Sequence, residues 1–182
     1  MKKKCIYIFD FDHTLFNAKK FREDLGRLIA GDKNIVSEVI WKEYRKKNKD
    51  LDNFLKKNSS DYVFPGVVDF LKKIEVKKVL LSFGDIAFQK EKVKSSGIYY
   101  LFDRVVFTLD NKLDFLKKFV KNNRGKKIIF INDNYNKRFD ENREVKRNIP
   151  EIKILEVDNY LSERNLSIDK IFRLLSEDKS CS

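Results

Sequence analysis

Cysteine and histidine are scarce in this sequence, which has two cysteines and one histidine among 182 residues. Cys5 lies in the first apolar stretch and Cys181 lies in the C-terminal tail, which is not the pattern of a disulfide framework. No group of Cys and His residues has the spacing of a zinc site. We therefore expect the fold to depend on a hydrophobic core, for which the chain is long enough.

Long apolar runs are also absent. The N-terminus, MKKKCIYIF, begins like a signal peptide, but its apolar stretch ends at Asp10, short of the roughly 7–15 residues of a signal-peptide core. No run approaches the roughly 18 apolar residues that suggest a membrane span. We therefore expect a cytoplasmic protein with no membrane association.

Positive charge is in excess, with a formal net charge of +12 at pH 7. The 40 Lys and Arg residues are scattered along the chain and do not form one basic arm or stripe. A lysine-rich solvated surface explains this distribution better than a nucleic-acid interface, and no RNA-recognition signature is present. The charge would favour encounter with an anionic substrate.

Short apolar runs rich in Val, Ile and Phe alternate with helical patterns along the chain. The runs are continuous, which is typical of strands buried on both faces of a parallel sheet. This order predicts an α/β fold with a doubly wound, mainly parallel five-stranded sheet. The expected strands are 5–9, 77–83, 104–107, 126–131 and 152–157, and the expected helices are 66–74, 87–97 and 111–123.

The segment from residue 17 to about residue 62 breaks this alternation. It has no strand-like run, but its apolar residues recur at helical spacing. It is either an ordinary helical insert packed on the core or a lid, and its position directly after the first strand favours the lid. The apolar stripes are Phe21, Leu25, Leu28 and Ile29; Val36, Val39, Ile40 and Tyr44; and Leu51, Phe54 and Leu55.

Polar side chains follow four of the expected strands. In an open α/β sheet, ligands bind beyond the carboxyl ends of the strands, so these side chains are expected to converge. Crowded carboxylates repel one another and require a cation. Because no Cys/His cluster accompanies them, a hard cation, first of all Mg²⁺, is expected. The side chains are Asp10, Asp12 and Thr14 after the first strand, Ser82 after the second, Lys112 after the third and Asp133 after the fourth.

These motifs resemble the signatures of the haloacid dehalogenase-like superfamily. The segment FDFDHTL resembles the first signature, an apolar strand followed by Asp-x-Asp-x-Thr-Leu. Ser82, Lys112 and Asp133 match the later signatures in the right order, and FPGVVDFLKKI resembles the Pro-Gly helix that precedes the second signature in many members. The resemblance spans roughly residues 5 to 160.

The resemblance implies a Rossmann-like core formed by residues 1–15 and 64–182, with residues 16–63 inserted as a small helical cap. It further implies a role for each matching residue. Asp10 would be the nucleophile and Asp12 the general acid and base. Mg²⁺ would be held by the Asp10 carboxylate, the Asp12 backbone carbonyl and Asp133. Ser82, Phe83 and Lys112 would bind the phosphoryl group.

The second aspartate indicates the reaction class. Superfamily members that cleave carbon–halogen bonds lack an acid at the position of Asp12, and transport ATPases carry threonine there. Asp12 therefore favours a Mg²⁺-dependent phosphatase that hydrolyses a phosphate monoester, most simply a phosphorylated small molecule, through an aspartyl-phosphate. The sequence does not identify the substrate or the oligomeric state.

Several residues near the signatures leave alternatives open. Asn132 stands where many members carry an acid or a glycine, and Asn134 or Asp140 could join the metal site in its place. Lys90 and Lys92 compete with Lys112 for the lysine role, but their segment, FQKEKVK, is interpreted as a solvated helix face. The single histidine, His13, is given no catalytic role.

Other functions remain compatible with the motifs. A receiver domain also uses an aspartate, a hydroxyl and a lysine around Mg²⁺, but in a different strand order, and a sugar transferase can carry Asp-x-Asp without Ser82 and Lys112. A phosphate-binding or regulatory protein with the same fold and little turnover is a closer alternative. A phosphotransferase or mutase would share the first half-reaction.

Overall fold

The computed structural model describes residues 5–34, 40, 46, 49–133, 141–158, 167–177 and 181. The strands are β1 (Cys5–Phe9), β2 (Lys77–Phe83), β3 (Arg104–Thr108), β4 (Lys127–Asp133) and β5 (Lys153–Val157). The helices are α1 (Ala18–Ala30), α3 (Lys49–Asn58), α4 (Val67–Lys73), α5 (Ile86–Ser95), α6 (Leu113–Asn122), α7 (Glu141–Asn148) and α8 (Ile168–Glu177), with 3₁₀ turns at Ser59–Tyr62 and Tyr99–Leu101. Each of these helices is too short or too polar to cross a membrane.

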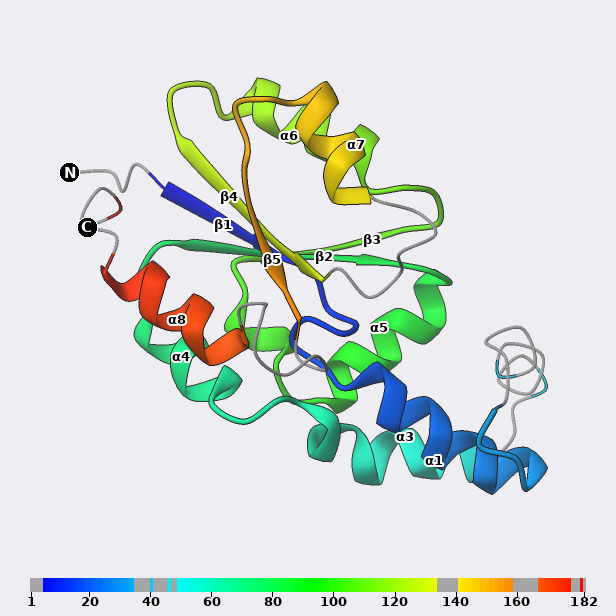
Figure 1. The fold of residues 1–182 in the computed structure, drawn as a ribbon. Helices are drawn as coiled ribbons and strands as arrows, with labels where there is room; N and C mark the ends of the chain where they lie inside the picture. Colours follow the sequence, from blue (N-terminus) through cyan, green and yellow to red (C-terminus); the bar gives the residue numbers. More distant parts are fainter. Residues whose placement is uncertain are drawn as a thin grey trace.

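The five strands form one parallel sheet in the order β3-β2-β1-β4-β5. Helices α6 and α7 cover one face of this sheet, and α4, α5 and α8 cover the other (Figure 1). The predicted doubly wound α/β architecture is therefore confirmed, and each predicted strand lies within two residues of its observed bounds at either end.

The central strand β1 is buried along its whole length. Ile6 and Ile8 pack in the core with α6 and α7, whereas Tyr7 and Phe9 pack in the core with α4 and α8. Two apolar faces explain why the run CIYIF does not alternate. The strand order reverses at β1, so the chain leaves this strand at the crevice where doubly wound folds bind ligands.

In the described part of the segment between β1 and α4, helices α1 and α3 pack on each other, and α3 packs on α5. Phe21 of α1 lies 5.2 Å from Tyr62 and 5.6 Å from Phe54, measured between ring centres. Of the expected apolar stripes, Leu28 is 49% exposed and does not belong to the buried face. Val36, Val39 and Tyr44 lie outside the described residues, and the division into a core and a cap at residues 16–63 stays a prediction.

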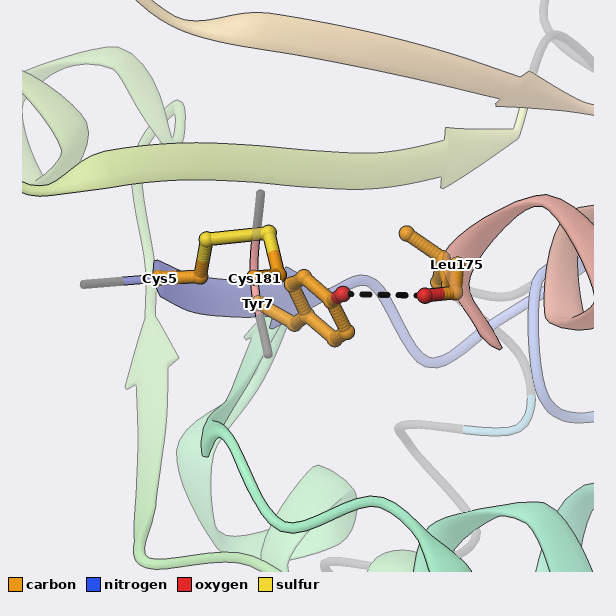
Figure 2. The surroundings of a disulfide bond; sticks show 4 residues. All are labelled: Cys5, Tyr7, Leu175 and Cys181. Atoms are coloured by element: carbon orange, nitrogen blue, oxygen red, sulfur yellow. Dashed lines mark hydrogen bonds between the residues drawn. A yellow bond between two sulfur atoms is a disulfide. The ribbon is translucent and has the colours of Figure 1, made fainter. Parts of the chain in front are cut away.

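The two cysteines form a disulfide between β1 and the C-terminal tail, which corrects the interpretation of the sequence (Figure 2). Cys5 and Cys181 are 176 residues apart in sequence, but their Cα atoms lie 5.2 Å apart. Helix α8 brings them together by packing on the β1 face, where Tyr7 Oη donates a hydrogen bond to the backbone carbonyl of Leu175 at 3.4 Å. Disulfides are rare in the cytosol, so the expected cytoplasmic location stays a prediction.

Loss of this disulfide is expected to destabilise the protein. A crosslink that closes so long a loop restricts the unfolded chain, and its removal by Cys181→Ser should lower the free energy of unfolding by about 3–5 kcal/mol. Urea unfolding, with and without a phosphine reductant, measures this difference. The reductant should lower the midpoint of the wild type and leave that of Cys181→Ser unchanged. Equal midpoints for the reduced and oxidised wild type would contradict the expected contribution.

Candidate active site

Asp10 occupies the end of the central strand. It is 4% exposed, and its N–H donates to the carbonyl of Ile131 at 2.9 Å, which extends the β1–β4 pairing past the end of β1. Thr14 Oγ1 donates to Asp10 Oδ2 at 3.4 Å. The loop between them turns back on itself, since the N–H of Phe16 donates to the carbonyl of Phe11 at 3.0 Å. The chain direction reverses here, and the first signature stays close to the sheet.

Lys112 is the counter-ion of Asp10. It stands at the N-cap of α6, is 5% exposed, and places Nζ 2.7 Å from Asp10 Oδ1 and 3.0 Å from Glu141 Oε2. Burial alone would lower the pKa of Lys112, but the two carboxylates raise it above its ordinary value. Burial raises the pKa of Asp10 well above its ordinary value, although Lys112 opposes this effect. Lys112 is therefore held as a cation against a carboxylate that is costly to ionise.

Asn132 and Glu141 complete the surroundings of Lys112. Asn132 is 2% exposed; its Oδ1 accepts from Lys112 Nζ at 3.0 Å, and its Nδ2 donates to Glu141 Oε2 at 3.1 Å and to Asn142 Oδ1 at 2.8 Å. The amide thus joins the lysine to a carboxylate from α7. Asp140, the replacement carboxylate suggested by the sequence, lies outside the described residues, and Glu141 was not among the predicted site residues.

Lys92 is a site residue that sequence analysis assigned to a solvated helix face, and this assignment is wrong. Lys90 is exposed, but Lys92 is 3% exposed, and its Nζ lies 2.7 Å from Oδ1 and 2.8 Å from Oδ2 of Asp12. The reason is the tertiary packing of α5. Helix α5 is covered by α3 and the turn at Ser59–Tyr62, so a face that would be solvated on an isolated helix lies inside the molecule.

Aromatic rings surround the Lys92 ammonium. Such rings stabilise a cation through the negative charge of their faces. Burial lowers the pKa of Lys92, and Asp12 opposes this effect. The ring centres of Phe11, Phe16 and Phe88 each lie 5.4 Å from Nζ, and that of Phe21 lies 5.7 Å away.

Gln89 shares the face of α5 that bears Lys92, because residues three positions apart on a helix are neighbours. Its Nε2 donates to Asp12 Oδ2 and to the carbonyl of Phe83, both at 3.1 Å. Burial would raise the pKa of Asp12, but Lys92 and Gln89 lower it below its ordinary value. Gly84 permits this contact: a Cβ there would lie 2.9 Å from Gln89 Nε2, and its φ is +130°.

Ser82 and Phe83 lie at the carboxyl end of β2, the strand next to β1. Ser82 is 1% exposed, whereas the side chain of Phe83 is 51% exposed. The ion pairs and side-chain hydrogen bonds of Asp10 and Lys112 within the described residues involve neither Ser82 nor Phe83. Their role in binding a phosphoryl group therefore stays a prediction.

The metal ligands predicted at the ends of β1 and β4 are all oxygen atoms. In the described part of the chain no three His, Cys, Asp or Glu side chains are grouped for a metal. The predicted set requires only two carboxylates, those of Asp10 and Asp133, with the backbone carbonyl of Asp12. After burial and Lys112, the charge of Asp133 is the next influence on the pKa of Asp10, which it raises. Neighbouring carboxylates with only oxygen donors fit Mg²⁺. Asn134 lies outside the described residues.

A pocket of about 230 Å³ adjoins Asp12 between α1 and α5. Arg22 and Phe21 of α1 line one side, and Phe88, Gln89 and Lys92 of α5 line the other. His13, in the loop after β1, is buried, and its Nε2 lies 3.4 Å from Arg22 Nη2.

Sequence comparisons identify no relative: no protein-family model matches this chain, and the comparison with curated proteins gives no significant match. Solved structures match over nearly the whole length. A haloacid dehalogenase-like hydrolase from Burkholderia xenovorans has a TM-score of 0.65 and 15% identity over 97% of each chain. A structure described as a β-phosphoglucomutase from Thermotoga maritima has a TM-score of 0.65 and 16% identity over 98% of this chain and 100% of that chain.

A third structure is the hydrolase YfnB from Bacillus subtilis, solved with bound magnesium. It has a TM-score of 0.64 and 11% identity over 96% of this chain and 99% of that chain. Similarity at this level of identity establishes the fold and leaves the reaction open. The Rossmann-like fold expected from the sequence is therefore confirmed, and the roles of the site residues stay proposals.

Proposed function

We propose that this chain, which has the fold of the haloacid dehalogenase-like hydrolases, is a Mg²⁺-dependent phosphatase acting on phosphate monoesters. The observation that carries the proposal is that Asp10 and Asp12, two residues apart in the sequence, have different ion-pair partners. Asp10 faces Lys112 at the end of β1, whereas Asp12 faces Lys92 at the pocket wall. Each carboxylate has its own cation, so the two lie in different surroundings and can serve as a nucleophile and a separate proton carrier.

The first half-reaction follows from this arrangement. Asp10 attacks the phosphorus in line, the new bond to its carboxylate oxygen forms, and the bond to the leaving oxygen breaks. Asp12 gives its proton to that oxygen, which departs as an alcohol into the pocket. The negative charge of a bound phosphoryl group favours the protonated form of Asp12 in this step and so opposes Lys92. Lys112 stabilises the charge on the phosphoryl oxygens.

The second half-reaction returns the site to its starting state. Asp12, now a carboxylate, takes a proton from water, and the water oxygen attacks the phosphorus of the aspartyl-phosphate. Phosphate leaves, and Asp10 is regenerated. Mg²⁺, held by Asp10, the backbone carbonyl of Asp12 and Asp133, would supply positive charge to the phosphoryl oxygens and keep Asp10 ionised.

Covalent labelling of the chain itself tests this function. The wild type is mixed with excess 4-nitrophenyl phosphate and Mg²⁺, quenched in acid within one turnover, and weighed by intact-protein mass spectrometry. We expect the mass of one phosphoryl group, removable by hydroxylamine and absent when EDTA replaces Mg²⁺. A contaminating phosphatase could release nitrophenol but could not add this mass. Turnover without the added mass would contradict the aspartyl-phosphate, and neither signal would favour a phosphate-binding role.

A further inference from the structure

Arg22 is a charged residue of the pocket lining that has no role in the reaction proposed above. Within the described residues its side chain contacts His13, with Nη2 3.4 Å from Nε2, and no carboxylate is paired with it. The nearby acids already have partners: Asp12 is bound by Lys92 and Gln89, and Asp24 is bound by Lys20, Arg27 and Tyr62. A guanidinium that lines a pocket without a counter-ion is a ready site for an anion.

The charged side chains that line the pocket have a net positive charge, which favours binding of an anion. Asp12 is balanced by Lys92, so Arg22 contributes the uncompensated charge of the lining.

We propose that Arg22 binds a second anionic group of the substrate, a carboxylate or a further phosphate, carried by the leaving group. This inference rests on the proposed function, because the leaving group is the part of a phosphate ester that would lie next to Asp12. The remaining lining suits a short, flat or apolar spacer between the two anions, since Phe21, Phe83 and Phe88 line the pocket. At about 230 Å³ the pocket is below the roughly 300–1,000 Å³ of drug-sized sites, so the leaving group is small.

A matched pair of aryl phosphates tests the inference. 4-Carboxyphenyl phosphate and 4-carbamoylphenyl phosphate have the same shape, and only the first carries a second anion. The carboxamide is the better leaving group, so a preference for the carboxylate cannot come from intrinsic reactivity. We expect kcat/KM to favour the carboxylate by about 10–100-fold, the range of one charge-assisted hydrogen bond. This ratio should fall to near one in Arg22→Met and largely persist in Arg22→Lys.

Arg27→Met is the matched control. Arg27 lies on the same helix and pairs with Asp24 on the surface, outside the pocket, so its loss should keep the wild-type ratio. Calorimetric binding of both esters to Asp10→Asn supplies a readout that needs no turnover. There the carboxylate should bind about 10–100-fold more tightly than the carboxamide, and Arg22→Met should remove the difference.

The outcomes separate this inference from the proposed function. Equal hydrolysis of both esters with a phosphorylated chain would overturn the second-anion site and leave the phosphatase intact. Selective binding of the carboxylate without hydrolysis would overturn the phosphatase and support the site. Failure of both esters to bind would overturn the site as well.

Discussion

Replacing Asp10 with asparagine is expected to abolish ester hydrolysis, with a loss of at least about 1,000-fold in kcat. The amide has nearly the same shape, its oxygen can still accept from Lys112 Nζ and its NH₂ group can donate to Thr14 Oγ1, but it cannot attack phosphorus. The measurement is steady-state hydrolysis of 4-nitrophenyl phosphate, with intact mass of the quenched chain. Retained phosphorylation of Asp10→Asn would identify another nucleophile, and Asp12 would be the first to examine.

The same substitution should leave the fold intact, which separates a chemical loss from unfolding. Burial raises the pKa of Asp10, so its carboxylate costs folding free energy at neutral pH. The favourable contribution is fully present below the ordinary pKa of Asp and is lost as the pH rises through the raised pKa of the folded protein. In metal-free buffer, Asp10→Asn should therefore be as stable as the wild type or more stable by about 1–2 kcal/mol. Asp114→Asn, an exposed aspartate on α6, is the matched control and should retain both activity and stability.

The sheet was predictable because the local sequence of its central strands indicates that both faces are buried. CIYIF and KIIFI are apolar at every position or nearly so, and only a strand covered on both faces requires this. The insert was recognised as helical because it lacks such runs. Helices α7 and α8 were not predicted, and the packing of α8 is what brings Cys5 and Cys181 together. Contacts across 176 residues leave no local signal.

The candidate site was predictable where it follows strand ends and unpredictable where a helix faces it from the side. Asp10 and Lys112 follow β1 and β3, and the sheet geometry alone brings them near. Lys92 lies in the second turn of α5, within a run of lysines that predicts a solvated helix face. In the structure this face is covered by α3 and the turn at Ser59–Tyr62. Its three-residue spacing from Gln89 was the available signal, since together they present an ammonium and an amide on one face.

Replacing Lys92 with methionine should damage the second half-reaction more than the first. Lys92 lowers the pKa of Asp12 and keeps it a carboxylate, the form that accepts a proton from water. Without Lys92, burial raises this pKa, so at neutral pH less Asp12 is available as a base. We expect kcat to fall about 10–100-fold, with phosphorylated chain accumulating in the steady state. Raising the pH should restore part of the rate in Lys92→Met.

Lys90→Met is the matched control on the same helix, because Lys90 is exposed; it should keep wild-type kinetics and leave no phosphorylated chain. Methionine is suited to the aromatic surroundings of Lys92, so packing is largely preserved and the change reports on charge. Kinetics of Lys92→Met that match those of Lys90→Met would remove Lys92 from the mechanism.

Stability supplies an independent test of the same ion pair. Lys92→Met leaves Asp12 without its counter-ion and should lower the free energy of unfolding by about 2–4 kcal/mol at pH 7, since the Asp12 side chain is 26% exposed and partly hydrated. The lowered pKa of Asp12 stabilises the wild type above the ordinary pKa of Asp, so the difference should shrink as pH falls below about 4. Adding Asp12→Asn to Lys92→Met should recover most of the loss, because no buried charge then lacks a partner. Additive losses in this double-mutant cycle would mean that Lys92 serves packing alone, and Asp12 would then need another source for its lowered pKa.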